Sequence, residues 1–129
     1  IRDRLCARLR AEPDVLAAWL FGSVGRGTDR PASDVDIAIL TSRPARHTLD
    51  DLWLDLRADL ASIAGREVDL VVVDDAPADL VHRVLRDGLL VLDRERGARI
   101  RFEVAARNRF FDMTPIWNEY RRARTRVPA

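Results

Sequence analysis

The stretches that decide the fold are Phe21-Gly-Ser-Val-Gly-Arg-Gly27 and Ser33-Asp-Val-Asp-Ile-Ala-Ile39. The first follows the apolar run Val15–Phe21 and carries three glycines in six residues, which predicts a strand that ends in a turn. In the second, branched apolar residues alternate with Asp34, Asp36 and Ala38, the pattern of a strand. Residues two apart leave a strand on the same face, so the carboxylates of Asp34 and Asp36 are expected to point together.

Working outward, the remaining hydrophobic patterns alternate between helices and strands. They predict helices over 1–11, 48–64 (capped by Thr48), 77–86 and 93–113, and strands over 15–21, 34–40, 68–73 and 89–92. Pro115 is expected to interrupt the last helix before an Arg-rich tail. The strand 68–73 is apolar on both faces beyond Asp69, which is typical of a strand buried under helices. The predicted fold class is α/β (α+β), a small mixed sheet flanked by helices. A single domain is expected over 1–129, with a C-terminal helical region at about 94–126.

Composition excludes several classes of protein. The 22 basic residues, all Arg, nearly balance 21 acidic ones in 129 residues, so the chain lacks the basic footprint expected for direct nucleic-acid binding. No apolar run is long enough for a membrane span, and the first residues do not resemble a signal peptide. Cys6 is the only cysteine, which excludes an internal disulfide and a thiolate zinc cluster. A cytoplasmic location is the expectation.

The paired carboxylates and the glycine turn together indicate a nucleotide site. Two anions held close need a cation between them, and Mg²⁺ prefers oxygen ligands completed by substrate phosphate. The turn after Gly22 and Ser23 offers backbone N–H groups and a hydroxyl to phosphate oxygens. Arg26 in this turn is either a phosphate contact or a solvated loop residue. These residues predict a site for a nucleoside triphosphate and its metal.

Asp69 is the third candidate ligand. If its strand lies beside the strand of Asp34 and Asp36, its carboxylate reaches the same metal cluster. It would then bind a second metal ion and accept a proton from an attacking hydroxyl. A lone carboxylate in an apolar strand is costly if it is buried without a partner, which also favours a functional role.

Other polar residues carry weaker signals. Asp74 and Asp75 precede Pro77 and favour capping or loop roles. His47 and His82 lack metal-ligand spacing and are predicted to be non-catalytic. The arginines at 121, 122, 124 and 126 suit a solvated tail or an acidic partner surface.

The motif Gly22-Ser23, ten residues, then Asp34-Val35-Asp36 resembles the signature of the DNA polymerase β-like nucleotidyltransferases. The wider pattern, with Val68-Asp69-Leu70 and Asp87-Gly88 before a short strand, is similar to the minimal nucleotidyltransferases, including the antitoxins of HEPN/MNT toxin–antitoxin pairs. The likeness covers most of the chain. Many relatives have Ala where this chain has Gly25, a small change that removes no ligand.

The resemblance implies an activity. Such antitoxins transfer AMP from ATP to a tyrosine of a partner HEPN ribonuclease. By this likeness Gly22 and Ser23 would hold the triphosphate, and Asp34, Asp36 and Asp69 would hold Mg²⁺ at a two-metal site with Asp69 as base. Two alternatives stay open: an antitoxin that neutralises by binding alone, and an aminoglycoside-type enzyme acting on a small molecule. The expected partner is a cognate HEPN toxin, and a homodimer is a further option.

Overall fold

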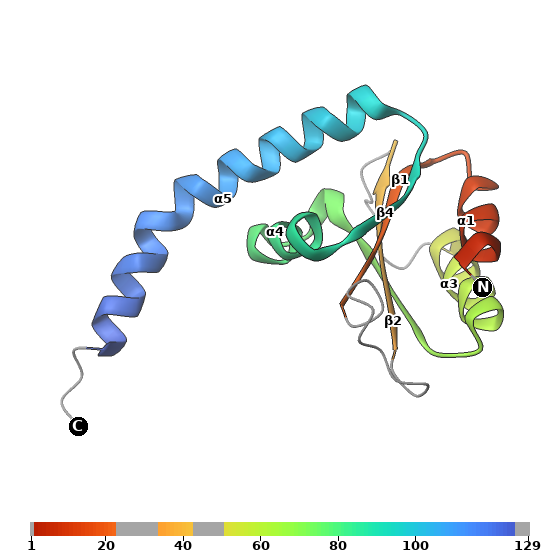
Figure 1. Cartoon of the computed structure of the whole chain (residues 1–129), viewed down its shortest axis with the longest axis horizontal. Helices are drawn as coiled ribbons and strands as arrows, with labels where there is room; N and C mark the ends of the chain where they lie inside the picture. Colours follow the sequence, from red (N-terminus) through yellow and green to blue (C-terminus); the bar gives the residue numbers. More distant parts are fainter. Residues whose placement is uncertain (1, 23–33, 43–50, 126–129) are drawn as a thin grey trace.

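A computed structural model describes the backbone of residues 2–22, 34–42 and 51–125, and the side chains in these ranges apart from 51–52 and 112–125. The elements follow the order α1 (Arg2–Arg10), β1 (Val15–Phe21), β2 (Val35–Thr41), α3 (Asp51–Ala64), β3 (Val68–Val72), a short 3₁₀ turn η1 (Val73–Asp75), α4 (Ala78–Asp87), β4 (Leu89–Asp93) and α5 (Arg96–Thr125). The mixed sheet flanked by helices, with a long C-terminal helix, confirms the predicted fold class (Figure 1).

The four strands form one mixed sheet in the order β3-β2-β1-β4. β1 runs antiparallel to both β2 and β4, whereas β2 and β3 are parallel. The condition set for Asp69, that its strand lies beside the strand of Asp34 and Asp36, is therefore met. The C-terminal end of β1 and the N-terminal ends of β2 and β3 meet at one side of the sheet.

Helices cover both faces of this sheet, as Figure 1 shows. On one face, α1 and α3 supply Leu5, Leu9, Leu56 and Leu60 to a core that also contains alternate residues of β1 and β2. On the other face, Val81 and Val84 of α4 and Ala106 of α5 pack against Ala17, Trp19, Ala38 and Leu40. Asp36 shares the strand parity of Ala38 and Leu40, so it lies on the α4–α5 face, at the end of the strand.

Two predictions about elements were wrong. Pro115 does not interrupt the last helix, because α5 continues to Thr125 instead of stopping at about residue 113. An internal proline removes one backbone hydrogen bond and clashes with one carbonyl, which bends a helix without necessarily ending it. Figure 1 shows α5 changing direction along its C-terminal half.

The apolar strand β3 is not buried under helices on both faces. It forms one edge of the sheet, and Leu70, Val71 and Val72 are only partly buried. Among the described residues, no helix is long and apolar enough to cross a membrane.

Candidate functional site

Backbone pairing brings two of the predicted site residues together. Phe21 pairs with Asp36 at the end of β1, and Asp36 pairs with Asp69 across the parallel strands β2 and β3. Residues paired in register project from the same face of a sheet, so the two carboxylates lie side by side. Asp34 precedes β2 by one residue and is exposed, as is Asp69, whereas Asp36 is half-buried. The structure therefore places Asp36 beside Asp69, with Asp34 two residues before Asp36.

Gly22 closes the site from the β1 side. Its φ of +69° lies in the left-handed region, where residues with a β-carbon are disfavoured. A β-carbon built at position 22 would stand only 2.2 Å from Oδ2 of Asp36. The backbone of Gly22 therefore packs directly against the Asp36 carboxylate, and only glycine satisfies both the torsion angle and the close approach.

The electrostatics of Asp36 reflect this crowding. Burial, and next the negative charges of Asp69 and Asp34, raise the pKa of the Asp36 carboxyl above its ordinary value. Each of these causes disfavours the ionised form. A divalent cation would reverse the balance because it attracts all three carboxylates and replaces lost hydration.

The donor chemistry of this corner suits a hard cation. The carboxylates of Asp34 and Asp69 act on that of Asp36 at the ends of neighbouring strands, and carboxylate oxygens are ligands that Mg²⁺ takes in proteins. Within the described ranges, however, no three His, Cys, Asp or Glu side chains form a ready-made metal cluster. Mg²⁺ is commonly bound in proteins by one or two carboxylates, and substrate phosphate then completes its shell.

Arg57 is a positioning residue that the sequence pattern did not indicate. Its Nε donates a hydrogen bond of 2.8 Å to the carbonyl oxygen of Val68, the residue before Asp69. The backbone N–H of Val35 donates to the carbonyl oxygen of Glu67 at 2.9 Å on the other side of the strand. The start of β3 is therefore held from α3 and from β2. Only tertiary contact brings Arg57 to this strand, so no local signal could have identified it.

Asp74 contacts the opposite end of the strand pair β2–β3. Its Oδ1 accepts a hydrogen bond of 3.1 Å from the backbone N–H of Thr41, a buried residue at the end of β2. Burial raises the pKa of the Asp74 carboxyl, although the hydrogen bond from Thr41 opposes that effect. Asp74 does not cap α4, whose N-terminal cap, Pro77, receives no side-chain hydrogen bond. Of the two roles expected for Asp74, the structure supports the loop role.

Some predicted residues lie outside the described part of the chain. These are Ser23 and Arg26 of the glycine turn, together with the cap Thr48 and His47. His82 is described, and its ring stacks on Phe110 with centroids 3.8 Å apart. Its contact is therefore with a ring of α5, and its non-catalytic role stays a prediction.

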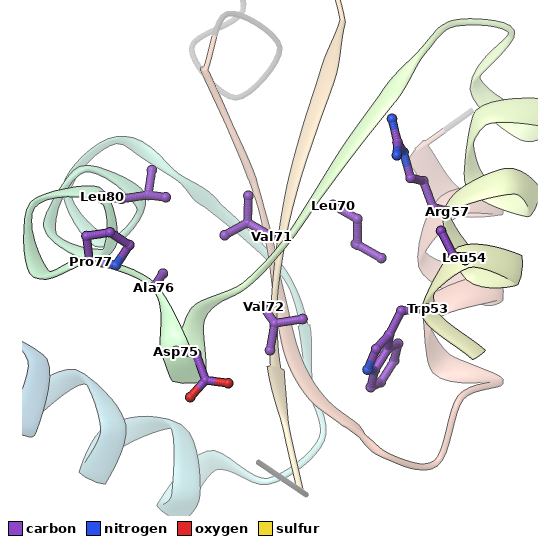
Figure 2. Close-up of a pocket in the computed structure, with 10 residues that line it drawn as sticks. All are labelled: Trp53, Leu54, Arg57, Leu70, Val71, Val72, Asp75, Ala76, Pro77 and Leu80. Carbon is purple, nitrogen blue, oxygen red and sulfur yellow. The ribbon is translucent and has the colours of Figure 1, made fainter. Parts of the chain in front are cut away.

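A groove of about 330 Å³ runs along the exposed edge of β3. Figure 2 shows Trp53, Leu54 and Arg57 of α3 on one side, Pro77 and Leu80 on the other, and β3 between them. Its walls are largely apolar, with Arg57 and Asp75 as the charged members. The groove follows the strand that carries Asp69, and the sequence did not predict it.

Comparison with known proteins agrees with this arrangement. Residues 4–97 match the family described as "Polymerase beta, Nucleotidyltransferase". A curated relative, "Protein adenylyltransferase MntA" of Shewanella oneidensis, is 38% identical over 78 residues, which cover 59% of this chain and 52% of the relative. The match thus spans about half the length of that relative.

Solved structures share the whole fold. A chain in a crystal structure described as a toxin–antitoxin with AMP-PNP superposes with a TM-score of 0.74 at 26% identity, covering 92% of this chain and 97% of the other. A chain in the complex of a tri-AMPylated Shewanella oneidensis HEPN toxin with an MNT antitoxin superposes at 0.68 and 24% identity, covering 92% and 94%, and supports the fold alone. With the family match over 94 residues and this shared architecture, the chain belongs to the polymerase beta nucleotidyltransferase family.

Proposed function

We propose that this chain is a Mg²⁺-dependent antitoxin that transfers AMP from ATP to a tyrosine hydroxyl of a partner HEPN ribonuclease. The observation that carries the proposal is that Asp36 pairs in register with Asp69, while the backbone of Gly22 packs against the Asp36 carboxylate. Carboxylates beside the close approach of Gly22 suit a metal-bound triphosphate.

The relatives support the chemistry and the kind of acceptor. The curated relative is named as a protein adenylyltransferase, and a structural neighbour at 26% identity is a toxin–antitoxin complex with an ATP analogue.

In this mechanism the carboxylates bind and orient the substrate. Asp34 and Asp36 would hold Mg²⁺ through their carboxylate oxygens, and the expected role of Gly22 and Ser23 is to donate to phosphate oxygens. When bound, Mg²⁺ neutralises charge on the phosphates and favours departure of pyrophosphate. The close approach of Gly22 fixes the Asp36 carboxylate in one position, which favours a single geometry for the metal.

Asp69 handles the proton. The tyrosine oxygen attacks the α-phosphorus, and the bond from that phosphorus to the oxygen bridging to the β-phosphate breaks. The hydroxyl proton passes to the Asp69 carboxylate, and pyrophosphate leaves with the electron pair of the broken bond. Asp69 is exposed at the edge strand, so an acceptor from a separate protein has access to it.

The proposal is tested by incubating the chain with α-labelled ATP, Mg²⁺ and the cognate HEPN protein. The label should appear on that protein, and it should require the metal. The Asp36→Asn variant should lose both metal-dependent ATP binding and transfer. The Asp69→Asn variant should retain much of the ATP binding while its kcat falls by about 100- to 10,000-fold, the usual contribution of a general base.

Asp75→Asn is a matched control because Asp75 is an exposed aspartate outside the site. It should transfer AMP at the wild-type rate. If no nucleoside triphosphate labels the HEPN protein, the proposed reaction is contradicted. If Asp36→Asn still protects cells from the toxin, neutralisation proceeds by binding alone.

A further inference from the structure

The outer face of α5 carries a row of exposed apolar side chains. Ile100, Val104 and Phe111 are 41%, 50% and 60% exposed. Their spacing of four and seven residues places them on one side of a helix. We call these three residues the α5 stripe. Large apolar side chains gathered on one face of a helix mark an interaction surface more often than scattered ones do.

The opposite side of α5 explains why the stripe faces outward. Ala106 is buried against α4 and the sheet, and Phe102 packs against the same cluster. Phe110 stacks on His82 of α4, which holds the helix farther along. The helix is thus anchored by one face, and the α5 stripe cannot turn into the core without undocking those residues.

The charges around the α5 stripe are mostly positive. Residues 96–111 contain five arginines and one acidic residue, Glu103. Glu103 accepts a hydrogen bond of 2.9 Å from Arg99 and lies 4.0 Å from Arg107, so its charge is neutralised within the helix. Arg96 and Arg101 are exposed, and among the described residues no carboxylate forms an ion pair with either.

We infer that the α5 stripe docks the acceptor protein through an apolar surface rimmed by acidic side chains. A second copy of this chain would bring like charges together at the same stripe, which opposes association. Nucleic acid would pair with the arginines but would leave the aliphatic side chains uncovered. This inference rests on the proposed function, because the α5 stripe would bind the protein acceptor whose tyrosine reacts at the carboxylate site.

Docking is tested with two variants of the full chain and one control. Ile100→Glu with Val104→Glu introduces charge into the α5 stripe, and Arg96→Glu with Arg101→Glu reverses its rim. Each should raise the Kd for the HEPN protein by at least about tenfold in calorimetric titration. Leu54→Glu, at an apolar residue 46% exposed on α3, should leave the Kd unchanged.

Kinetics separate docking from catalysis. The two α5 variants should raise the KM for the acceptor and keep kcat at saturating acceptor, with unchanged ATP binding. Higher salt should narrow the difference between the wild-type chain and the rim variant, because salt screens exposed charges. Equal melting temperatures for the variants and the wild type would verify that folding is intact.

Three outcomes overturn the inference. The first is an unchanged Kd for the HEPN protein in both α5 variants. The second is a wild-type chain that is dimeric by itself and becomes monomeric in these variants, which would assign the α5 stripe to a second copy. The third is that the α5 variants lose binding to labelled single-stranded RNA but still bind the HEPN protein as the wild type does. Failure of the proposed function looks different: the complex forms and depends on the α5 stripe, yet the wild-type chain transfers no AMP.

Discussion

Gly22 and Asp36 meet where β1 ends and β2 begins, and each restricts the other. The φ of Gly22 lies in the left-handed region, and the missing β-carbon leaves room for the Asp36 carboxylate. The same closeness contributes to the burial that raises the pKa of Asp36. Although glycine and alanine differ by only one methyl group, Gly22 is part of the geometry of the site.

Gly22→Ala should impair both folding and transfer. A left-handed φ costs a residue with a β-carbon about 1–2 kcal/mol, and the new methyl group also displaces the Asp36 carboxylate. We expect the free energy of unfolding in urea to fall by at least about that amount. Transfer should fall at least about tenfold, because small displacements of a ligand are costly in catalysis.

Gly65→Ala is the matched control. Gly65 has nearly the same torsion angle, with φ of +67°, but a β-carbon there meets nothing within 4 Å. It should show the backbone cost alone and keep the wild-type rate of transfer. Equal losses of transfer in the two variants would contradict the role given to close approach at Gly22.

At the scale of the elements, side-chain hydrogen bonds hold the strand pair β2–β3 at both of its ends. Arg57 of α3 holds the start of β3, and Asp74 in η1 holds the end of β2. Because both strands carry site aspartates, these ties limit how far Asp36 and Asp69 can move relative to each other. The two polar contacts join a side chain to a backbone group of a segment distant in the sequence.

Asp74→Ala should destabilise the protein, because the buried N–H of Thr41 loses its acceptor. The expected cost is about 1–3 kcal/mol in the free energy of unfolding. Asp74→Asn keeps an oxygen acceptor and removes the ionisation. Since burial raises the pKa of Asp74 in the folded state, the stability contributed by the protonated form is lost as pH rises through that raised pKa.

The Asn variant should therefore lose less stability than the wild type between pH 4 and neutral pH, a window set by the ordinary pKa of about 4 and its upward shift. Urea unfolding at a series of pH values measures this difference. Asp75→Ala serves as the control, because Asp75 is exposed. Parallel pH profiles for the wild type and Asp74→Asn would contradict the assigned direction of the pKa shift.

Across the whole molecule, α5 connects the sheet to the surface proposed for docking. Thirty residues of helix extend about 45 Å, and Figure 1 shows its last turns running beyond the other elements. The first half is anchored through Ala106 and the ring stack of His82 with Phe110. The position of the α5 stripe relative to the carboxylate site depends on this anchoring.

Ala106→Glu should separate α5 from α4, because it places an unpaired charge in a buried contact. We expect a loss of about 3–5 kcal/mol in the free energy of unfolding and a large rise in the KM for the protein acceptor. Ala105→Glu, at the exposed neighbouring position, should change neither quantity. Retained acceptor binding by Ala106→Glu would show that docking does not depend on the anchoring of α5.

The sequence alone determined the local elements and the identity of the candidate ligands. Alternating apolar residues around Asp34 and Asp36 predicted β2, and the glycines after Phe21 predicted the end of β1, because these signals depend on near neighbours. The spacing of Gly22 and Ser23 from Asp34 and Asp36 identified the family. The roles of Ser23 and Arg26 stay predictions, because both residues lie outside the described part of the chain.

Only the tertiary structure decided how these parts meet. Strand order placed β3 at an edge beside β2, which brought Asp69 into register with Asp36 and left a groove along its outer side. The approach of Gly22 to Asp36, the ties from Arg57 and Asp74, and the outward direction of the α5 stripe all depend on residues distant in sequence. Local patterns do not encode such contacts, because packing of the whole chain selects among locally similar arrangements. The helix α5 also continues through Pro115, where the local rule predicted an interruption, because a proline inside a helix bends it without necessarily ending it.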